Sequence, residues 1–421
     1  VADDTLISDD LLRQLVAVGQ VDLVVGVVTH DHASTIGALV RAVHKCFATF
    51  FPRQRTVLLN SDGGSTDETA AIVRACCVDE TDTVTTSHRL RTAHRISARH
   101  HPALGRADAI RLVLKSAELL QAKALVLLDP DLIEVAPERV ASLAMPVLVD
   151  GFDFLAPVYD RPPADGLLVT QLLRPLFGGL YGRTLSEPLA AEGGYSGGFV
   201  TTVAEDVAGA VDALALTSTA LTGPYSLGEV HLGPRLVSPG RARGSVGDVF
   251  REVVGTAFDA LEAHASHWLT SKASEALPIV SRGVAHASRE WWVSSHGARL
   301  PETFADDVRN LDEILRRVLA PGTFEAIASN AASPAPPYPD RLWAATVAEF
   351  LVAYHTGVMR RDHIVQALMP LYLARAGVFL REHEAASPAD VATATDAICA
   401  EFVEIKRYVV EHWLTSARGT S

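Results

Sequence analysis

Three short apolar runs, separated by segments of helical length, constrain the fold of this chain most strongly. They lie within residues 21–28, 55–60 and 125–128. Continuous runs of Val and Leu without polar alternation are typical of parallel strands that are buried on both faces. Residues 34–46 and 105–120 lie between them and have a helical period of apolar positions. The alternation predicts a doubly wound α/β domain, with a mostly parallel sheet flanked by helices.

Each apolar run ends in polar residues that suit a phosphate or a cation. The first ends at 29–35 with Asp31, the second leads into Asp62-Gly63-Gly64, and the third ends in Asp129-Pro130-Asp131. The carboxyl end of such a strand, followed by a helix, is a usual place for a nucleotide. Two carboxylates one residue apart often hold Mg²⁺ or Mn²⁺ against a diphosphate. A plain Asp-Pro turn with solvated carboxylates explains the same residues equally simply.

Two further stretches are candidates for ligand binding. Arg106 begins a helix, where the macrodipole disfavours a cation, so it is either solvated or placed to meet a diphosphate. Glycines cluster around Glu192 and Tyr195 in the string 187–198. Clustered glycines indicate close backbone approach, to a ligand or to another segment of the chain.

Composition excludes some classes of function. The chain of 421 residues carries 37 Lys and Arg against 50 Asp and Glu, a net charge of −13. This acidity argues against nucleic acid as a partner. The sequence contains no uninterrupted apolar run of about 18 residues, so we expect no transmembrane segment. Four cysteines without metal-type spacing fit free thiols in a reducing cytoplasm.

The pattern changes near residues 241–246, where glycine and arginine replace apolar periodicity. Beyond this point only helical periods appear. We therefore expect two domains, an α/β domain over 1–243 and an α-helical domain over 244–421. The helical tail could form a homodimer interface or pack internally.

The strings Asn60–Asp67 and Asp129–Asp131 together resemble GT-A glycosyltransferases of the family-2-like superfamily. Within these, the chain is similar to the retaining group that contains glucosyl-3-phosphoglycerate, glucosylglycerate and mannosyl-3-phosphoglycerate synthases. The resemblance extends over residues 7–239 and continues at 368–375. It implies a GT-A fold and transfer of a hexose, with retention of α configuration, from a nucleotide-diphosphate sugar of UDP or GDP type. The implied acceptor is a small hydroxylated molecule such as glycerate.

Carried over by position, the resemblance implies a role for each matching residue. The implied catalytic residues are Glu192, Asp129 and Arg106. The implied nucleotide-sugar-binding residues are Thr29, Asp31, Asp62, Gly63, Arg106, Asp129 and Gly193. Thr170 and Tyr195 are the implied acceptor contacts, and Asp131 with Asp129 would hold a divalent cation, Mg²⁺ or Mn²⁺.

Two positions depart from the family pattern. The family's histidine metal ligand falls on Val237, which cannot ligate. His231 is the nearest substitute, although it lies about 20 Å from Val237 along an extended strand. The family's acceptor-phosphate arginine falls on Leu168, which cannot replace a guanidinium fork. The metal requirement and the acceptor phosphate are therefore open.

Two alternatives to a glycosyltransferase remain at this point. Val237 and Leu168 favour a degenerate, transferase-like module that binds a nucleotide-sugar without turnover. A sugar-1-phosphate nucleotidylyltransferase also uses an α/β sheet with acidic metal ligands. It would need a glycine-rich basic loop after the first strand, which residues 29–35 lack.

Overall fold

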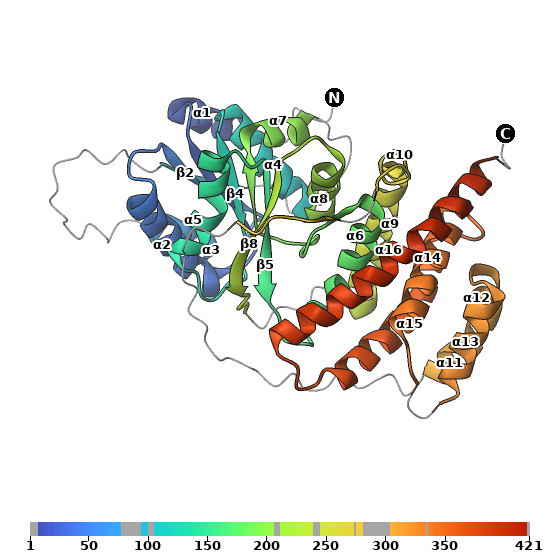
Figure 1. Ribbon diagram of the computed structural model, residues 1–421. Coiled ribbons are helices and arrows are strands. Elements are labelled where there is room, and N and C mark those ends of the chain that lie inside the picture. Colours follow the sequence, from blue (N-terminus) through green and yellow to red (C-terminus); the bar gives the residue numbers. More distant parts are fainter. Residues whose placement is uncertain are drawn as a thin grey trace. The chain divides into compact units, whose positions relative to one another are not determined.

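The computed structural model describes residues 7–76, 94–99, 105–205, 211–238, 245–272, 275–280, 304–333 and 336–418 (Figure 1). The chain divides into two compact units that interleave along the sequence. The sheet unit comprises Val1–Tyr159, Leu189–Gly240 and Pro278–Ala287, and the helical unit comprises Asp160–Pro188, Arg241–Leu277 and Ser288–Ser421. This division differs from the two continuous domains expected over 1–243 and 244–421, because residues 160–188 belong to the helical unit.

Within the described residues, the sheet unit contains a seven-stranded sheet of order β3-β2-β1-β4-β7-β5-β8. Its strands are β1 Leu23–Thr29, β2 Thr56–Asp62, β3 His94–Arg99, β4 Ala124–Leu128, β5 Phe154–Asp160, β7 Gly193–Ser196 and β8 Leu227–Pro234. Strands β3, β2, β1 and β4 are parallel, and β7 runs antiparallel between β4 and β5. The expected α/β class with a mostly parallel sheet is confirmed. Residues 94–99 form β3 at one end of this strand order.

Helices cover both faces of this sheet (Figure 1). They are α1 Asp9–Val18, α2 Ala33–Phe50, α3 Thr69–Ala75, α4 Gly105–Leu119, α5 Pro137–Met145, α7 Gly197–Glu205 and α8 Ala213–Thr222, with a π-helical turn η3 at Pro146–Asp150. Side chains alternate across β1, as strand geometry requires. Val25 and Val27 join the core with Ile36 and Leu39 of α2. Gly26 points to the other face, where an added Cβ would lie 2.4 Å from Val113 Cγ1 of α4.

The helical unit confirms the expected α-helical region. Its helices are α6 Arg174–Tyr181, α9 Val246–Ala263, α10 Ala265–Trp268, α11 Phe304–Asn310, α12 Asp312–Val318, α13 Pro321–Ala331, α14 Asp340–Thr356, α15 Arg361–Glu382 and α16 Pro388–Arg418, preceded by the π-helical η4 Val169–Leu173. Two short strands, β6 Arg183–Thr184 and β9 Glu275–Ala276, pair in parallel. Arg375 of α15 is buried and donates to Gln171 Oε1 (3.1 Å) and to the Tyr338 carbonyl (2.6 Å).

Among the described helices, one passes a test of length and composition for crossing a membrane. It is α15, whose apolar window is 67% buried inside the protein. A core helix of a globular unit passes the same test, so this finding is weak support for a membrane span.

Candidate functional site

The carboxyl ends of β2, β1 and β4 lie next to one another at one edge of the sheet. Thr29 of β1 is in register with Asp62 of β2, and Val27 is in register with Leu128 of β4. Asp129 follows β4 directly. The topology therefore brings three of the predicted polar segments to one edge, which is where α/β sheets bind nucleotides.

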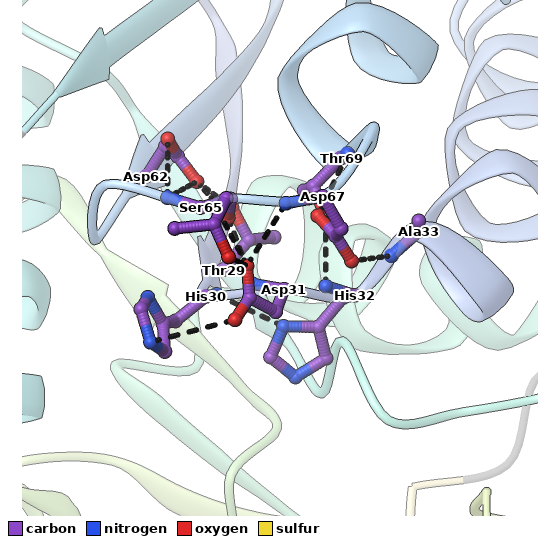
Figure 2. A network of polar contacts seen from close by, with 10 residues as sticks. Thr29, His30, Asp31, His32, Ala33, Asp62, Ser65, Asp67 and Thr69 are labelled. Atoms are coloured by element: carbon purple, nitrogen blue, oxygen red, sulfur yellow. Dashed lines mark hydrogen bonds and ion pairs between the residues drawn. The ribbon is translucent and has the colours of Figure 1, made fainter.

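Asp31 joins the loop after β1 to the loop after β2 (Figure 2). Its Oδ1 accepts from the backbone N–H groups of Thr66 (2.6 Å) and Asp67 (3.2 Å), and its own N–H donates to Ser65 Oγ (2.8 Å). Asp31 has φ of +55°, a left-handed conformation that Asp tolerates better than most residues. A carboxylate that accepts two backbone N–H groups fixes the relative position of both loops.

Asp67, in the loop after β2, makes a second connection between the two loops (Figure 2). Its Oδ2 accepts from Ala33 N (3.0 Å) at the start of α2, and its Oδ1 accepts from Thr69 N (2.9 Å). Burial alone would raise the pKa of Asp67, but hydrogen bonds from Thr69 and Ala33 stabilise the charged form and lower it. The ionised carboxylate thus also neutralises the positive end of α2.

Asp62 is fully buried at the end of β2. It accepts from Ser65 N (3.2 Å to Oδ2) and lies 3.3 Å from Thr29 Oγ1, which also lies 3.0 Å from Asn60 Oδ1. Asn60 Nδ2 has no partner among the described residues. One hydroxyl proton cannot serve two acceptors. Rotating the Asn60 amide by 180° brings Nδ2 to Thr29 Oγ1, so that the amide donates to the hydroxyl and the hydroxyl donates to Asp62.

The Asp129-Pro130-Asp131 turn after β4 is held on several sides. Asp129 is 1% exposed and accepts from Asp131 N (3.1 Å), and Thr35 Oγ1 of α2 donates to the Pro130 carbonyl (2.6 Å). Arg235 Nη2 forms an ion pair with Asp129 Oδ2. Asp129 is therefore engaged by its own turn and by a cationic side chain.

Residues 235–238, just after β8, run alongside this turn. Ile133 N donates to the Leu236 carbonyl (3.0 Å), and Ser238 N donates to the Asp131 carbonyl (2.8 Å). Val237 forms an antiparallel bridge with Leu132. The position that resembles the family's histidine is thus beside the aspartate turn, although valine occupies it.

His32 is a site residue that the sequence reasoning missed. Its Nε2 lies 3.1 Å from Asp131 Oδ1, and its side chain is 15% exposed. The string Thr29-His30-Asp31-His32 at a strand end contained the necessary signal. His231, the suggested substitute, is an exposed residue of β8, and the histidine beside Asp131 is His32 instead. The described residues contain no group of three or more His, Cys, Asp or Glu able to hold a metal.

Glu192 is placed differently from the catalytic role expected for it. It is 1% exposed and forms a bidentate ion pair with Arg139 of α5, at 2.9 Å (Nε to Oε1) and 2.6 Å (Nη2 to Oε2). Tyr159 also donates to Glu192 Oε2 (2.7 Å). Burial acts to lower the pKa of Arg139, but the charge of Glu192 and its hydrogen bonds raise it overall. Glu192 is therefore committed to a buried structural pair.

The glycines of 193–197 serve protein packing. Gly193 and Gly194 lie in strand β7, where a Cβ on Gly194 would stand 2.3 Å from the Leu143 carbonyl oxygen. Interior glycines in strands mark such backbone approach. Tyr195, 3% exposed, stacks on Phe199 at 5.8 Å between ring centroids. Burial raises the pKa of its hydroxyl. The geometry does not support the ligand contacts expected for Gly193 and Tyr195.

The remaining predicted residues are Thr170, Arg106 and Gly63. Thr170, the other expected acceptor contact, is buried in η4 of the helical unit, where Gln171 Nε2 donates to its Oγ1 (3.4 Å). The backbone of Arg106 lies in the first turn of α4, but its side chain is outside the described residues. Gly63 N donates to the Thr29 carbonyl (2.7 Å), so it takes part in joining the strand ends.

Comparisons with known proteins are limited to structures. No family model and no curated protein matches the chain. Among solved structures, a mycobacterial protein shares 22% identity over 58% of this chain and 77% of its own, with a TM-score of 0.43. Glucosyl-3-phosphoglycerate synthase from Mycobacterium tuberculosis, in complex with phosphoglyceric acid, shares 21% identity over 59% and 83%, also at 0.43.

A further structure of that synthase contains Mn²⁺, uridine-diphosphate-glucose and phosphoglyceric acid. It shares 20% identity over 61% of this chain and 84% of its own, with a TM-score of 0.43. TM-scores below 0.5 do not establish a common function. Any functional conclusion therefore depends on the residues of this chain.

Proposed function

We propose that this protein is a nucleotide-sugar-dependent glycosyltransferase of the GT-A type. The main support for this proposal is that Asp62, the Asp31 loop and the Asp129–Asp131 turn lie at adjacent strand ends on one edge of the sheet. Open α/β sheets bind nucleotides at this edge. Hydrogen bonds between the loops after β1 and β2 hold this edge in one arrangement before a ligand binds.

The positive groups for a diphosphate come from this same edge. The α2 helix of 18 residues begins at Ala33, and Thr35 in its first turn donates to the Pro130 carbonyl of the aspartate turn, while Asp67 offsets part of the positive charge at this helix end. Arg235 is 25% exposed in its side chain and contributes a guanidinium. As the sugar–phosphate bond breaks, negative charge grows on the departing diphosphate, and fixed positive groups stabilise that charge.

The finer assignments also belong to this proposal. The donor is a UDP- or GDP-type hexose, the acceptor is a small hydroxylated molecule, and the α configuration is retained. Under front-face attack, the leaving phosphate takes the proton of the acceptor hydroxyl, and no protein base is required. This scheme agrees with the commitment of Glu192 to Arg139. Buried free thiols at Cys46 and Cys399 fit a reducing cytoplasm.

Thermal denaturation with UDP, GDP, ADP and their hexose conjugates tests donor binding. We expect one nucleotide series to raise the melting temperature, since a ligand that binds only the folded state stabilises it. Release of labelled hexose from that donor is the second measurement. An unchanged melting temperature with every nucleotide would contradict the proposal.

A nucleotide-sugar-binding module without turnover is the second candidate. Leu168 and Val237, in place of an arginine and a histidine, favour it. The same two measurements separate it from a transferase. Binding of a donor without hydrolysis or transfer, across a panel of small hydroxylated acceptors, would establish the module instead.

A further inference from the structure

Both carboxylates of the Asp129–Asp131 turn already have partners within the protein. Arg235 Nη2 pairs with Asp129 Oδ2, while Asp129 Oδ1 accepts from Asp131 N. His32 Nε2 lies 3.1 Å from Asp131 Oδ1. Each aspartate that the resemblance would assign to a metal is therefore bound by a nitrogen of this chain.

The hydrogen bonds of His32 fix where its ring proton lies. Nδ1 accepts from His30 N at 2.9 Å, so it carries no proton. The proton of the neutral ring is then on Nε2, between that nitrogen and Asp131. Imidazole coordinates a metal through an unprotonated nitrogen. His32 thus acts as a hydrogen-bond donor to Asp131, and neither of its nitrogens is available as a ligand.

A divalent cation does not fit this arrangement. It would have to enter beside the guanidinium of Arg235, which carries the same sign of charge. Val237 supplies no third ligand, and the described part of the chain has no group of three or more metal-binding side chains. The donor set therefore disagrees with the cation that the family resemblance implies.

We infer that donor binding and turnover by this protein are independent of divalent cations. Arg235 is the counter-charge of Asp129, and His32 satisfies Asp131, so the turn keeps its shape without a metal. Ser238 N, on the Asp131 carbonyl at 2.8 Å, reinforces that shape through the backbone. The inference rests on the proposed function and concerns the same site.

The direct test uses the full chain after dialysis against EDTA. The melting-temperature shift with UDP, GDP and their hexose conjugates, and the rate of donor consumption, are measured in EDTA, Mg²⁺ and Mn²⁺. We expect affinity and rate to differ by less than about threefold between EDTA and either cation, a difference of less than about 1 kcal/mol. A larger gain with cation overturns the inference and leaves the proposed function intact.

Failure of the proposed function would give a different result from failure of the inference alone. No response to any nucleotide, with or without cation, overturns the transferase and the inference together. Binding in EDTA without any turnover in any condition supports cation-independent binding and points to the module reading, but it overturns the inference for turnover.

Arg235→Ala provides a second, independent readout. Removing the guanidinium leaves Asp129 without its counter-charge, so Mn²⁺ should bind the free variant measurably by calorimetry, whereas the parent protein should show no such heat. Donor affinity in EDTA should fall by about tenfold or more and recover in part with Mn²⁺. Arg235→Gln, which keeps much of the side-chain volume, takes its place if the alanine variant does not fold.

Arg13→Ala is the matched control, because Arg13 lies on α1 with a side chain 78% exposed. It should leave donor affinity unchanged and introduce no Mn²⁺ binding. Equal Mn²⁺ binding by the parent protein and by Arg235→Ala would overturn the role assigned to Arg235.

Discussion

At the scale of single residues, Glu192, to which the resemblance assigns a catalytic role, forms a buried ion pair with Arg139. Arg139 Nη1 also donates to the Leu232 carbonyl at 3.0 Å, so the pair ties α5 to β8. The segment that carries Arg235 begins directly after β8. The pair therefore connects α5 with the strand that leads into Arg235.

Glu192→Gln should lower the free energy of unfolding by about 3 kcal/mol, because it leaves a buried guanidinium without its counter-charge. Tyr159→Phe is the matched control. It removes one hydrogen bond to the same carboxylate and should cost about 1 kcal/mol. Urea denaturation measures both variants. A Gln variant as stable as the parent would show that the pair contributes nothing to folding.

Asp67 provides a pH prediction at the same scale. Its folded pKa is lowered, so its hydrogen bonds stabilise the protein above its unfolded pKa, which is about 4. That contribution disappears as the pH falls through the lowered folded pKa. Asp67→Asn should therefore be less stable than the parent at pH 6, and the difference should shrink below pH about 4. Urea denaturation at several pH values would contradict this if the difference stayed constant.

At the scale of elements, strand β7 depends on glycine for its place in the sheet. A Cβ on Gly194 would lie 2.3 Å from the Leu143 carbonyl, and one on Gly197 would lie 2.2 Å from the Ala122 carbonyl. Both obstacles are backbone atoms, which cannot rotate away. The β7–α7 junction must therefore stay close to α5 and to the start of β4.

Gly194→Ala should destabilise the sheet unit by about 1–3 kcal/mol or more through overpacking. Gly198→Ala is the control, because its nearest neighbour, Ser196 Oγ, is 3.9 Å from the added Cβ. In the first turn of α7, alanine there should be neutral or stabilising by up to about 1 kcal/mol. Chemical denaturation decides the matter. Equal effects of the two substitutions would exclude backbone contact as the cause.

The sequence predicts the parallel part of this sheet better than its antiparallel insertion. Strands β1, β2 and β4 are continuous apolar runs, so their polar ends could be placed at one edge. Strand β7 has four residues, three of them Gly193, Gly194 and Ser196, and offers no such pattern. The partner of Glu192 is 53 residues away in sequence, and only tertiary packing brings the two together. The glycine cluster alone left open whether a ligand or another segment approaches the backbone, and the structure shows the carbonyls of Leu143 and Ala122 at Gly194 and Gly197.

At the scale of the whole molecule, the residues expected to bind the donor belong to the sheet unit, whereas Thr170, an expected acceptor contact, belongs to the helical unit. The side chain of Arg106 is outside the described residues. The homodimer stays a prediction. Binding energy at the edge of β1, β2 and β4 is then added to the folding free energy of the sheet unit. The helical unit has its own buried core, with Trp343 Nε1 donating to the Gln171 carbonyl at 2.5 Å.

Saturating donor nucleotide should therefore slow amide hydrogen exchange unequally along the chain. At about 100 times its Kd, a ligand adds about 2.7 kcal/mol, or about a hundredfold in exchange through unfolding of the unit that binds it. We expect this slowing in β1 and β2, whose strand ends carry Asp31 and Asp62, and little change in α14 and α16. Mass spectrometry of peptides from both units measures it. Equal slowing in both would show that the two units unfold as one.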